Sequence, residues 1–470
     1  MNMDPCCPRP GGYDLAVLGA GSAGFAAAIA AADLGARVAL IGHGTIGGTC
    51  VNVGCVPSKT MIRAAEAVHA ARAAARFPGL AGTAQVTDWA ALIGAKQALV
   101  ETLRARKYTD LLPGYPGITY IAGRAHLVAG GVAMDARIIP AANVVIATGA
   151  RPAIPGIPGL AAVPFLDSTS ALELEAPPRS MIVLGARYVG CELAQMFARL
   201  GVAVTLVARS RVLPEAEPEI GAALTGYLEA DGVTVRTGLA YHRAALDGDR
   251  VALDIVVEGR VKTLRAERLL VATGRTPNVD DVASDVALDR GGVKVDAWMR
   301  TSRASTYAAG DVTGRDMFVY MAAHGGKIAA LNALDGVSRR YDRSAIPWVV
   351  FTDPQVTGVG LTEAAARAEG HAVKVSLVSL QDVPRALAAR DTRGLIKLVA
   401  DARTDRLLGA QILAPEGGDS IMTAAVALRA GMTTRALAET IFPYLTTVEG
   451  LKLAALGFQT DLARLSCCAG

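Results

Sequence analysis

The chain has 470 residues, is 52% hydrophobic and carries a formal net charge of +4, from 47 Lys and Arg against 43 Asp and Glu. This length exceeds one ordinary core, so we expect several domains. The nearly balanced, scattered charge argues against a nucleic-acid-binding face, and no apolar run reaches the roughly 18 residues of a membrane helix.

Residues 1–12 are rich in Pro and Gly and form the expected flexible leader. They contain no apolar stretch of the kind found in secretory signals, so we expect a cytoplasmic protein. Cys6 and Cys7 lie in this leader, either incidentally or as a short metal-capturing arm.

A strand–turn–helix–strand motif follows the leader. Apolar runs predict strands over residues 15–18 and 37–41, and an alanine-rich segment predicts a helix over residues 25–34. The first strand leads into a G-x-G-x-x-G turn formed by Gly19, Gly21 and Gly24. Such a turn lets a pyrophosphate approach the backbone at the N-terminus of the helix, so the motif predicts a dinucleotide-binding fold.

The second strand of this motif is followed by Gly42 and His43. Dinucleotide-binding folds commonly place Asp or Glu about 20 residues after the turn, where it hydrogen-bonds a ribose hydroxyl. Glycine has no side chain for this bond. The dinucleotide is therefore expected to be held differently at this position, or through a water molecule.

The segment GGTCVNVGCVPSK carries Cys50 and Cys55 at the expected start of a long helix, with Lys59 one turn further on. The positive end of a helix stabilises a thiolate and lowers its pKa. Two such thiols can cycle between dithiol and disulfide, or bind one soft metal ion. A structural disulfide is the alternative.

A second motif of the same kind begins near residue 179. Strands are predicted over residues 181–184 and 202–207, with Gly185 and Gly190 in the turn and Arg187 at the middle glycine position. The flanking pattern still predicts a dinucleotide fold. The chain is therefore expected to bind two dinucleotides, one flavin and one nicotinamide.

The identity of the nicotinamide dinucleotide depends on the end of the second strand. Ala208 stands where NAD-binding folds usually place an acid, and Arg209 and Arg211 follow it. Arginines suit the 2′-phosphate of NADPH through bidentate charge pairing. We therefore expect NADPH; a solvated pair of arginines is the alternative.

Further segments accompany the two motifs. NVVIATGARP (143–152) and RLLVATGRTPN (268–278) each follow one motif, which indicates a duplicated module. TYAAGDV (306–312) contains Asp311 after an apolar approach, a carboxylate that suits a ribityl or ribose hydroxyl. Stretches 149–159 and 343–360 are predicted as linkers.

GAGSAG, GGTCVNVGCVPSK, the two ATG segments and TYAAGDV together resemble the flavoprotein disulfide reductase family. The resemblance implies a homodimer of α/β fold, with two Rossmann-like domains for FAD and NADPH and a C-terminal α+β dimerisation domain. The implied division is a leader (1–12), the FAD domain in two parts (13–150 and 277–342), the NADPH domain (151–276) and the dimerisation domain (343–470).

The resemblance also implies roles for single residues, with electrons passing from NADPH through FAD to the cysteine pair. Cys55 matches the charge-transfer thiolate against the flavin, and Cys50 the outer, exchanging sulfur. Lys59 and Glu192 match a charged pair near the flavin, and Tyr188 matches the tyrosine that covers its nicotinamide side. The implied cofactor-binding residues are Gly19, Gly21, Gly24, Gly44, Thr49, Lys59, Ala125, Thr148, Gly149, Asp311, Val319, Gly185, Gly190, Arg209, Arg211 and Gly274.

One departure from the family concerns the substrate. Disulfide reductases of the family carry a His-Pro-Thr-x-x-Glu segment, whose His passes protons to the leaving thiol. Here the matching segment is FPYLTTVEGLK, with Tyr444 at the His position and Glu449 retained. A tyrosine, with a pKa near 10, is a poor proton shuttle at neutral pH. A metal-ion substrate needs no such proton on sulfur.

The chain ends in RLSCCAG, which places Cys467 and Cys468 near the C-terminus. With VFTDPQV, DVPRALA and FPYLTTVEGLKLAA, this ending resembles the Hg(II)-reducing members of the family. Hg(II) is soft and prefers two thiolates. The resemblance implies that the tail of one subunit passes Hg(II) to the Cys50–Cys55 pair of the other, past Tyr188 and Tyr444. The pairs Cys50–Cys55 and Cys467–Cys468 are thus the expected metal ligands.

Two alternatives stay open. One is an NADPH-dependent disulfide reductase that uses the C-terminal dithiol as a relay, which the missing His opposes. The other is a flavoprotein that sequesters Hg(II) without reducing it. The remaining cysteine, Cys191, is expected to be a buried helix residue with no part in catalysis.

Overall fold

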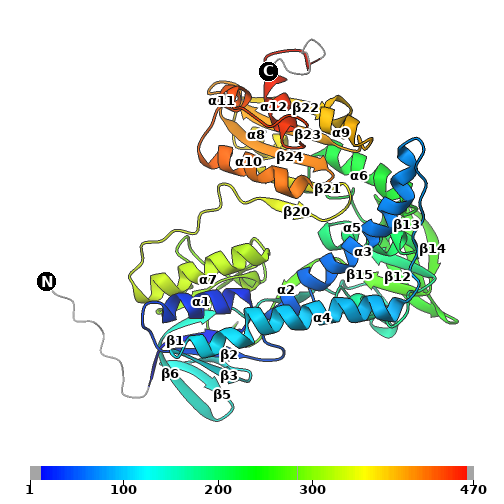
Figure 1. Ribbon diagram of the computed structural model, residues 1–470. Coiled ribbons are helices and arrows are strands. Elements are labelled where there is room, and N and C mark those ends of the chain that lie inside the picture. The colour runs from blue at the N-terminus through cyan, green and yellow to red at the C-terminus, as the bar shows by residue number, and fades with distance from the viewer. Residues whose placement is uncertain (1–11, 283, 463–470) are drawn as a thin grey trace. The chain divides into compact units, whose positions relative to one another are not determined.

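The computed structural model describes residues 12–282 and 284–462 (Figure 1). The chain forms two compact units, each built from three separate segments. The first comprises the segment ending at Thr60, Ala90–Ala153 and Gly274–Asp342. The second comprises Met61–Trp89, Ile154–Thr273 and the segment that begins at Arg343.

The first unit is organised around a seven-stranded sheet in the order β3-β2-β1-β6-β5-β4, with β19 also paired to β6. Strands β3, β2, β1, β6 and β19 run parallel, and β5 and β4 continue the sheet in antiparallel fashion. Almost every residue of β1 and β2 is buried, as in parallel sheets covered on both faces. The strands are β1 (Tyr13–Leu18), β2 (Val38–Gly42), β3 (Ile118–Ala122), β4 (His126–Val128), β5 (Gly131–Met134), β6 (Arg137–Ile146) and β19 (Thr306–Ala308).

Two helices of this unit, α1 (Ser22–Ala32) and α7 (Val319–Leu334), lie side by side against the sheet (Figure 1). Their backbones approach so closely that a Cβ on Gly326 would lie 2.1 Å from the carbonyl oxygen of Ala23. The abundance of Ala and Gly in both helices is therefore a packing requirement. The remaining helices that begin or lie in this unit are α2 (Gly48–Asn52), α3 (Cys55–Ala73) and α4 (Trp89–Lys107).

The second unit contains a parallel five-stranded sheet in the order β11-β10-β9-β15-β8. Helix α5 connects β9 to β10, and helix α6 connects β10 to β11. An antiparallel three-stranded sheet, β12-β13-β14, is inserted before β15. The elements are β8 (Phe165–Leu166), β9 (Ser180–Leu184), α5 (Tyr188–Arg199), β10 (Ala203–Val207), α6 (Pro218–Ala230), β11 (Thr234–Arg236), β12 (Ala240–Asp247), β13 (Arg250–Val257), β14 (Arg260–Ala266) and β15 (Arg268–Val271).

The C-terminal part of the second unit is an antiparallel sheet in the order β20-β21-β24-β23-β22. Helix α10 packs against β21 and β24, and α12 against β22 and β23. The elements are β20 (Trp348–Val350), β21 (Gln355–Gly360), α8 (Glu363–Ala368), β22 (Val373–Ser379), α9 (Pro384–Ala388), β23 (Leu395–Asp401), β24 (Leu407–Ala414), α10 (Gly417–Arg429), α11 (Thr434–Glu439) and α12 (Glu449–Leu456).

This sheet corrects the expectation of a linker over residues 343–360. Strands β20 and β21 occupy half of that stretch, and five of the six residues of β21 are buried. The Pro and Gly residues suggested a linker, but the β-branched residues between them form sheet. The other expected linker, 149–159, contains strand β7 (Ala150–Pro152), which pairs with β16 (Arg275–Pro277).

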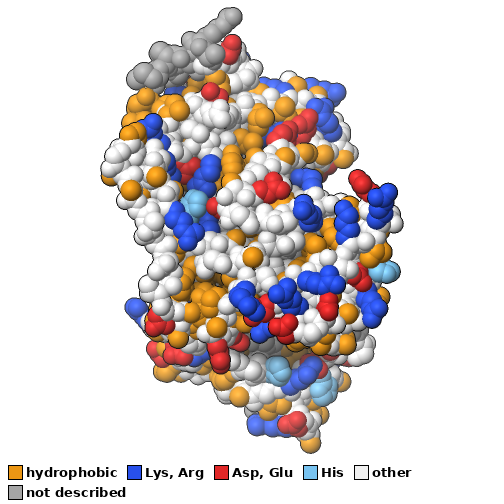
Figure 2. Space-filling view, turned by 90° about the vertical axis from the view of Figure 1, so that its right-hand side faces the viewer, with side chains coloured by type: hydrophobic (Ala, Val, Ile, Leu, Met, Phe, Trp, Pro, Cys, Tyr) orange, Lys and Arg blue, Asp and Glu red, His pale blue; other side chains and the backbone are white. Residues whose placement is uncertain are grey.

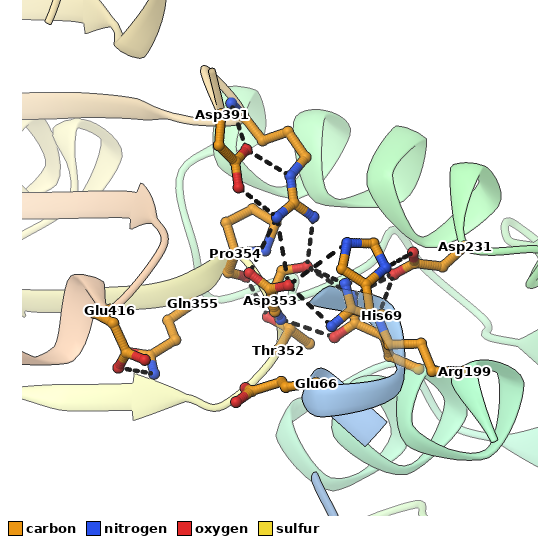
Figure 3. Close-up of polar contacts among 12 residues, drawn as sticks. Glu66, His69, Arg199, Asp231, Thr352, Asp353, Pro354, Gln355, Asp391 and Glu416 are labelled. Atoms are coloured by element: carbon orange, nitrogen blue, oxygen red, sulfur yellow. Dashed lines mark hydrogen bonds and ion pairs between the residues drawn. The ribbon is translucent and has the colours of Figure 1, made fainter. Parts of the chain in front are cut away.

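A charged network holds segments of the second unit together (Figure 3). Arg199 of α5 is 3% exposed and forms ion pairs with Asp231, at 3.0 Å, and with Asp353, at 2.9 Å. His69 of α3 lies between the same two carboxylates, 3.3 Å from Asp231 and 3.9 Å from Asp353. Arg393 completes the neutralisation of Asp353 at 3.2 Å. Asp353 belongs to the VFTDPQV segment, so this stretch is fixed by charge pairing as well as by the sheet.

The charged side chains of the surface are mixed. Figure 2 shows Lys and Arg interspersed with Asp and Glu over the face in view, with hydrophobic side chains between them. Among the described residues, none of the helices combines the length and apolar character that crossing a membrane requires.

Candidate active site

The first glycine turn has the close packing that a dinucleotide-binding fold requires. A Cβ on Gly19 would lie 2.1 Å from the carbonyl oxygen of Ala147, and one on Gly24 would lie 1.8 Å from the carbonyl oxygen of Gly19. At Gly21, in contrast, a Cβ would meet only the Cα of Gly48, at 3.6 Å. The middle position is therefore open in front of α1, and this space fits the pyrophosphate of FAD.

The second turn repeats this geometry. A Cβ on Gly185 would lie 2.5 Å from the carbonyl oxygen of Ala272, and one on Gly190 would lie 1.8 Å from that of Gly185. Arg187 replaces the middle glycine with a φ of −91° and a ψ of −164°, an extended conformation that any residue adopts. The substitution therefore causes no backbone strain, and both turns retain the fold that the duplicated sequence predicts.

The two expected redox cysteines lie on consecutive helices. Cys50 is in the short helix α2, and Cys55 is the first residue of α3. Asn52 fixes the loop before α2, because its amide donates to the carbonyl oxygens of Ile46 and Gly48, both at 2.9 Å. Arg104 of α4 in turn donates to the Asn52 side-chain oxygen at 3.2 Å.

Cys50 and Cys55 are not joined by a disulfide in this structure, and Cys50 is half-buried while Cys55 is exposed. A hydrogen bond with Cys55, burial and the charge of Cys55 together raise the pKa of Cys50, and the Lys59 ammonium partly opposes this rise. Cys50 therefore holds its proton more firmly than an isolated thiol does.

Two tyrosines near the thiols were not predicted from the sequence. Burial raises the pKa of Tyr108, and the charges of Cys50 and Cys55 raise it further. Burial also raises the pKa of Tyr320, to which the charges of Asp316 and Cys55 contribute. Both phenols therefore stay protonated beside the cysteine pair. Neither residue belongs to a recognisable motif, so no signal in the sequence marked them.

Several of the predicted FAD-binding positions meet at the carboxyl end of the first sheet. Asp311 follows β19, and burial raises the pKa of its carboxyl group while Arg275, at 3.7 Å, opposes the rise. Thr148 is engaged elsewhere, since its hydroxyl donates to the carbonyl oxygen of Asn278 at 2.6 Å. Gly149 adopts a φ of +73° with open space where a side chain would be. Asp311 and Gly149 therefore fit a polar ligand, and Thr148 holds two loops together.

Two expected catalytic residues lie in the second unit on α5. Tyr188 stacks on the indole ring of Trp348, with ring centroids 5.6 Å apart and an interplanar angle of 16°. Glu192 is buried, and its carboxylate accepts a hydrogen bond from the backbone N–H of Phe351 at 2.9 Å. Both residues thus attach the start of α5 to the segment at β20, in addition to any role toward a cofactor.

The two arginines after β10 have different environments. Arg211 donates hydrogen bonds to the backbone carbonyl oxygens of four residues, which are Leu213, Pro214, Ala216 and Glu217. Its guanidinium therefore holds the loop that leads to α6. Arg209 is exposed at the end of the strand. Only Arg209 of this pair retains its guanidinium for a ligand.

Tyr444 lies in an exposed loop of the C-terminal part and is 47% exposed, beside Ile441 at 93%. Glu449, which the family motif places near this position, accepts a hydrogen bond from the backbone N–H of Leu445 at 3.1 Å. Glu449 thus holds the loop in shape. The loop therefore presents the phenol of Tyr444 at the position where the family has an imidazole.

The remaining predicted residues are distributed as follows. Gly44 and Gly274 have positive φ and open space where a side chain would be, Thr49 lies in α2, Ala125 is buried, and Val319 begins α7. Cys191 is buried in α5, as expected, and its thiol donates to the carbonyl oxygen of Ala186 at 3.3 Å. Cys6, Cys7, Cys467 and Cys468 lie outside the described residues.

A metal ion would find few ligands near the described cysteines. Within residues 12–282 and 284–462, no group of three or more His, Cys, Asp or Glu side chains is arranged to hold a metal. Among these residues Cys50 and Cys55 offer two sulfur ligands, and a pair of thiolates suits a soft ion.

Comparison with known proteins decides the family. The family described as pyridine nucleotide-disulphide oxidoreductase matches residues 13–326, and its dimerisation domain matches residues 346–455. The chain belongs to the pyridine nucleotide-disulphide oxidoreductase family. Family membership confirms the expected FAD and pyridine nucleotide, and the dimerisation domain indicates a homodimer.

Several members of this family are similar to nearly the whole of this chain. The chain is 46% identical to the mercuric reductase of Streptomyces lividans, covering 98% of this chain and 99% of the relative. It is also 46% identical to the mercuric reductase of Shigella flexneri, over 98% of this chain and 83% of that protein. Among solved structures, the Cu(II) complex of the HOCl-induced flavoprotein disulfide reductase RclA from Escherichia coli matches with a TM-score of 0.83 and 29% identity, covering 94% of this chain and 99% of that one.

Proposed function

We propose that the protein is an NADPH- and FAD-dependent oxidoreductase that reduces Hg(II) to elemental mercury. The observation that carries this proposal is the Cys50–Cys55 pair at the start of α3, with no third metal ligand of the usual types among the described residues. Similarity to mercuric reductases over nearly the whole chain supports it.

The overall reaction converts NADPH and Hg(II) into NADP⁺, a proton and Hg(0). Bound FAD supplies the two-electron relay between the nicotinamide and the metal site. The protein's own contribution is to bind Hg(II) through two sulfurs. Both sulfurs bind the ion as thiolates, and Cys50, whose pKa is raised in the free pair, loses its proton to the surroundings as the bound metal's positive charge lowers the thiol pKa. Hg(0) leaves because a neutral, reduced atom has little affinity for thiolates.

The tail cysteines complete the proposal. We assign Cys467 and Cys468 the role of capturing Hg(II) from small thiols and passing it to Cys50 and Cys55 of the other subunit. Stepwise thiolate exchange makes this possible, since each new sulfur binds before an old one leaves. The dimerisation domain over residues 346–455 supports a two-subunit arrangement. Tyr188 and Tyr444 are proposed to line the path of the metal.

We further propose that Arg209 selects NADPH by binding its 2′-phosphate. Arg211 takes no part in this selection, because its guanidinium is engaged by the loop that follows. A cytoplasmic location accords with both requirements of the reaction, a supply of NADPH and thiols that stay reduced.

The second candidate is an NADPH-dependent disulfide reductase with a C-terminal dithiol relay. The similarity to a solved flavoprotein disulfide reductase favours it. Tyr444 argues against it, because a phenol cannot deliver protons to a leaving thiolate at neutral pH as an imidazole does.

NADPH oxidation by the purified flavoprotein separates the two candidates. The assay offers Hg(II) with excess small thiol in one arm and a panel of disulfides in the other, including a low-molecular-weight disulfide and a protein disulfide. We expect NADPH consumption with Hg(II), release of volatile mercury in equal amount, and little turnover of any disulfide. Turnover of a disulfide without turnover of Hg(II) would establish the alternative. Stoichiometric Hg(II) binding without NADPH consumption would identify a sequestering protein.

A further inference from the structure

Gly42, at the end of β2, occupies a place where no larger residue fits. A Cβ on Gly42 would lie 2.6 Å from the Cβ of Ala20 and 3.0 Å from the hydroxyl oxygen of Tyr120. Contacts between carbon atoms of folded proteins are rarely closer than about 3.5 Å, so any side chain here would displace a neighbour. The acid that dinucleotide-binding folds usually carry at this position is therefore excluded by two residues of the chain itself.

Tyr120 reaches this place from the neighbouring strand. In the parallel pairing of β2 with β3, Leu40 lies opposite Tyr120 and Gly42 opposite Ala122. Tyr120 and Ala122 point to the same face of the sheet because side chains alternate along a strand. The tyrosine ring extends along the strand toward its carboxyl end, and its hydroxyl lies beside Gly42, at the edge of the sheet where dinucleotides bind.

We propose that the Tyr120 hydroxyl binds a ribose hydroxyl of the FAD adenosine, in place of the missing acid. A phenol both donates and accepts a hydrogen bond, so it can pair with a ribose hydroxyl as a carboxylate does. Ala20 and Tyr120 fill the space beside Gly42, so the polar group at this place comes from β3 and not from β2.

The state of the phenol is consistent with this role. Burial raises the pKa of Tyr120, so the group stays neutral over the working range of an enzyme. A neutral phenol offers one donor hydrogen as well as lone pairs, whereas a carboxylate only accepts. The exposed neighbour His43 is the other polar side chain at the end of β2 and is the natural control. The proposal rests on FAD binding by the first fold, and it holds whether the substrate is Hg(II) or a disulfide.

FAD affinity of the apoprotein tests the proposal directly. Flavin is removed from the wild type, Tyr120→Phe and His43→Ala, and FAD is titrated back while flavin fluorescence is followed. We expect Tyr120→Phe to bind FAD about 3- to 10-fold more weakly, the effect of one hydrogen bond, and His43→Ala to match the wild type. The thermal midpoint of each apoprotein, measured without FAD, shows whether the isosteric Phe leaves the fold intact.

Ribose analogues identify the partner of the hydroxyl. Two analogues are titrated, FAD without the 2′-hydroxyl and FAD without the 3′-hydroxyl of its adenosine. The analogue that lacks the hydroxyl bound by Tyr120 should bind the wild type more weakly than FAD does. The same analogue should bind Tyr120→Phe as tightly as FAD does. Equal losses for both proteins, or an affinity of Tyr120→Phe equal to that of the wild type, would refute the proposal. A loss confined to His43→Ala would transfer the role to the imidazole. Failure of the Hg(II) assay alone leaves these binding results unaffected, so the two proposals are tested separately.

Discussion

The thiol of Cys50 is hydrogen-bonded to that of Cys55, and this contact is the largest cause of the raised pKa of Cys50. Cys50 therefore holds its proton more firmly than an isolated thiol does, and a bound cation would favour loss of that proton.

Serine substitution of either cysteine should remove the activity. We expect Cys50→Ser and Cys55→Ser to reduce Hg(II)-dependent NADPH oxidation to the background rate, because one sulfur alone cannot provide two thiolates. The flavin should still be reduced by NADPH, since the nicotinamide site is unchanged. Stopped-flow absorbance of the flavin and steady-state NADPH oxidation measure the two steps.

Cys191→Ala is the matched control. Cys191 is fully buried, and burial raises the pKa of its thiol, so it takes no part as a thiolate. Its removal should leave the rate of Hg(II) reduction unchanged. Activity of Cys50→Ser or Cys55→Ser near that of the wild type would eliminate the pair as the metal site.

Removal of the two tail cysteines should have an effect that depends on free thiol. With Hg(II) offered in excess small thiol, the Cys467→Ala/Cys468→Ala variant should turn over slowly, because it lacks the exchange step that strips the competing ligands. With limiting thiol, turnover should approach that of the wild type. The rate is measured as a function of thiol concentration, with the buried Cys191→Ala as the control. Identical thiol dependence of wild type and tail variant would contradict the hand-off.

Substitution of each of the two arginines after β10 should affect a different property, nucleotide selection for one and stability for the other. Arg209→Ala should raise the KM for NADPH about 10-fold and leave that for NADH unchanged, because a charged hydrogen bond to the 2′-phosphate is lost. Arg211→Ala should leave the NADPH to NADH ratio unchanged but destabilise the protein by about 1–3 kcal/mol, since carbonyl groups lose their donor. Steady-state kinetics with both nucleotides and thermal unfolding make the distinction. A changed ratio in Arg211→Ala would reverse the assignment.

The fold was predictable because its strongest signals are local. The turns at Gly19 and Gly185 impose the same backbone contacts in both halves, and strand and helix positions follow from them. The expected strands over residues 15–18 and 181–184 are confirmed as β1 and β9 to within a few residues. The linker expected over residues 343–360 was wrong, because Pro and Gly there interrupt a sheet and do not replace it.

The site was less predictable where residues act across strands. The sequence marks the loss of an acid at Gly42, but only the pairing of β2 with β3 brings the hydroxyl of Tyr120 to that place. In the same way, Arg209 and Arg211 look equivalent in sequence, and their difference arises from the carbonyl groups of a loop further along the chain. Such relationships depend on three-dimensional neighbours that motif spacing does not encode.

The charged network around Arg199 also has no sequence signature, and it should dominate the stability of the second unit (Figure 3). Arg199→Met should destabilise the protein by about 3–5 kcal/mol, because it leaves the carboxylates of Asp231 and Asp353 without their buried partner. The control is Arg265→Ala, whose ion pair with Asp247 is shorter, at 2.6 Å, but about half exposed. That loss should cost no more than about 1 kcal/mol. Equal losses of stability in the two variants would show that burial does not set the strength of the network.

The same variant should change the response to acid. Burial opposes ionisation of Asp231, but a hydrogen bond from His69, the charge of Arg199 and a hydrogen bond from Gln195 hold its pKa below the ordinary value. A lowered pKa stabilises the fold above the ordinary carboxyl pKa of about 4, and this stabilisation is lost as pH falls through that value toward the lower pKa of the folded state. Without Arg199 the pKa of Asp231 in the folded state rises. Protonation of Asp231 therefore costs the variant less stability than it costs the wild type. Denaturant unfolding between pH 7 and pH 3 measures the difference in free energy of unfolding between wild type and Arg199→Met. This difference should narrow below about pH 4. A difference that stays constant with pH would mean that Asp231 is not coupled to Arg199.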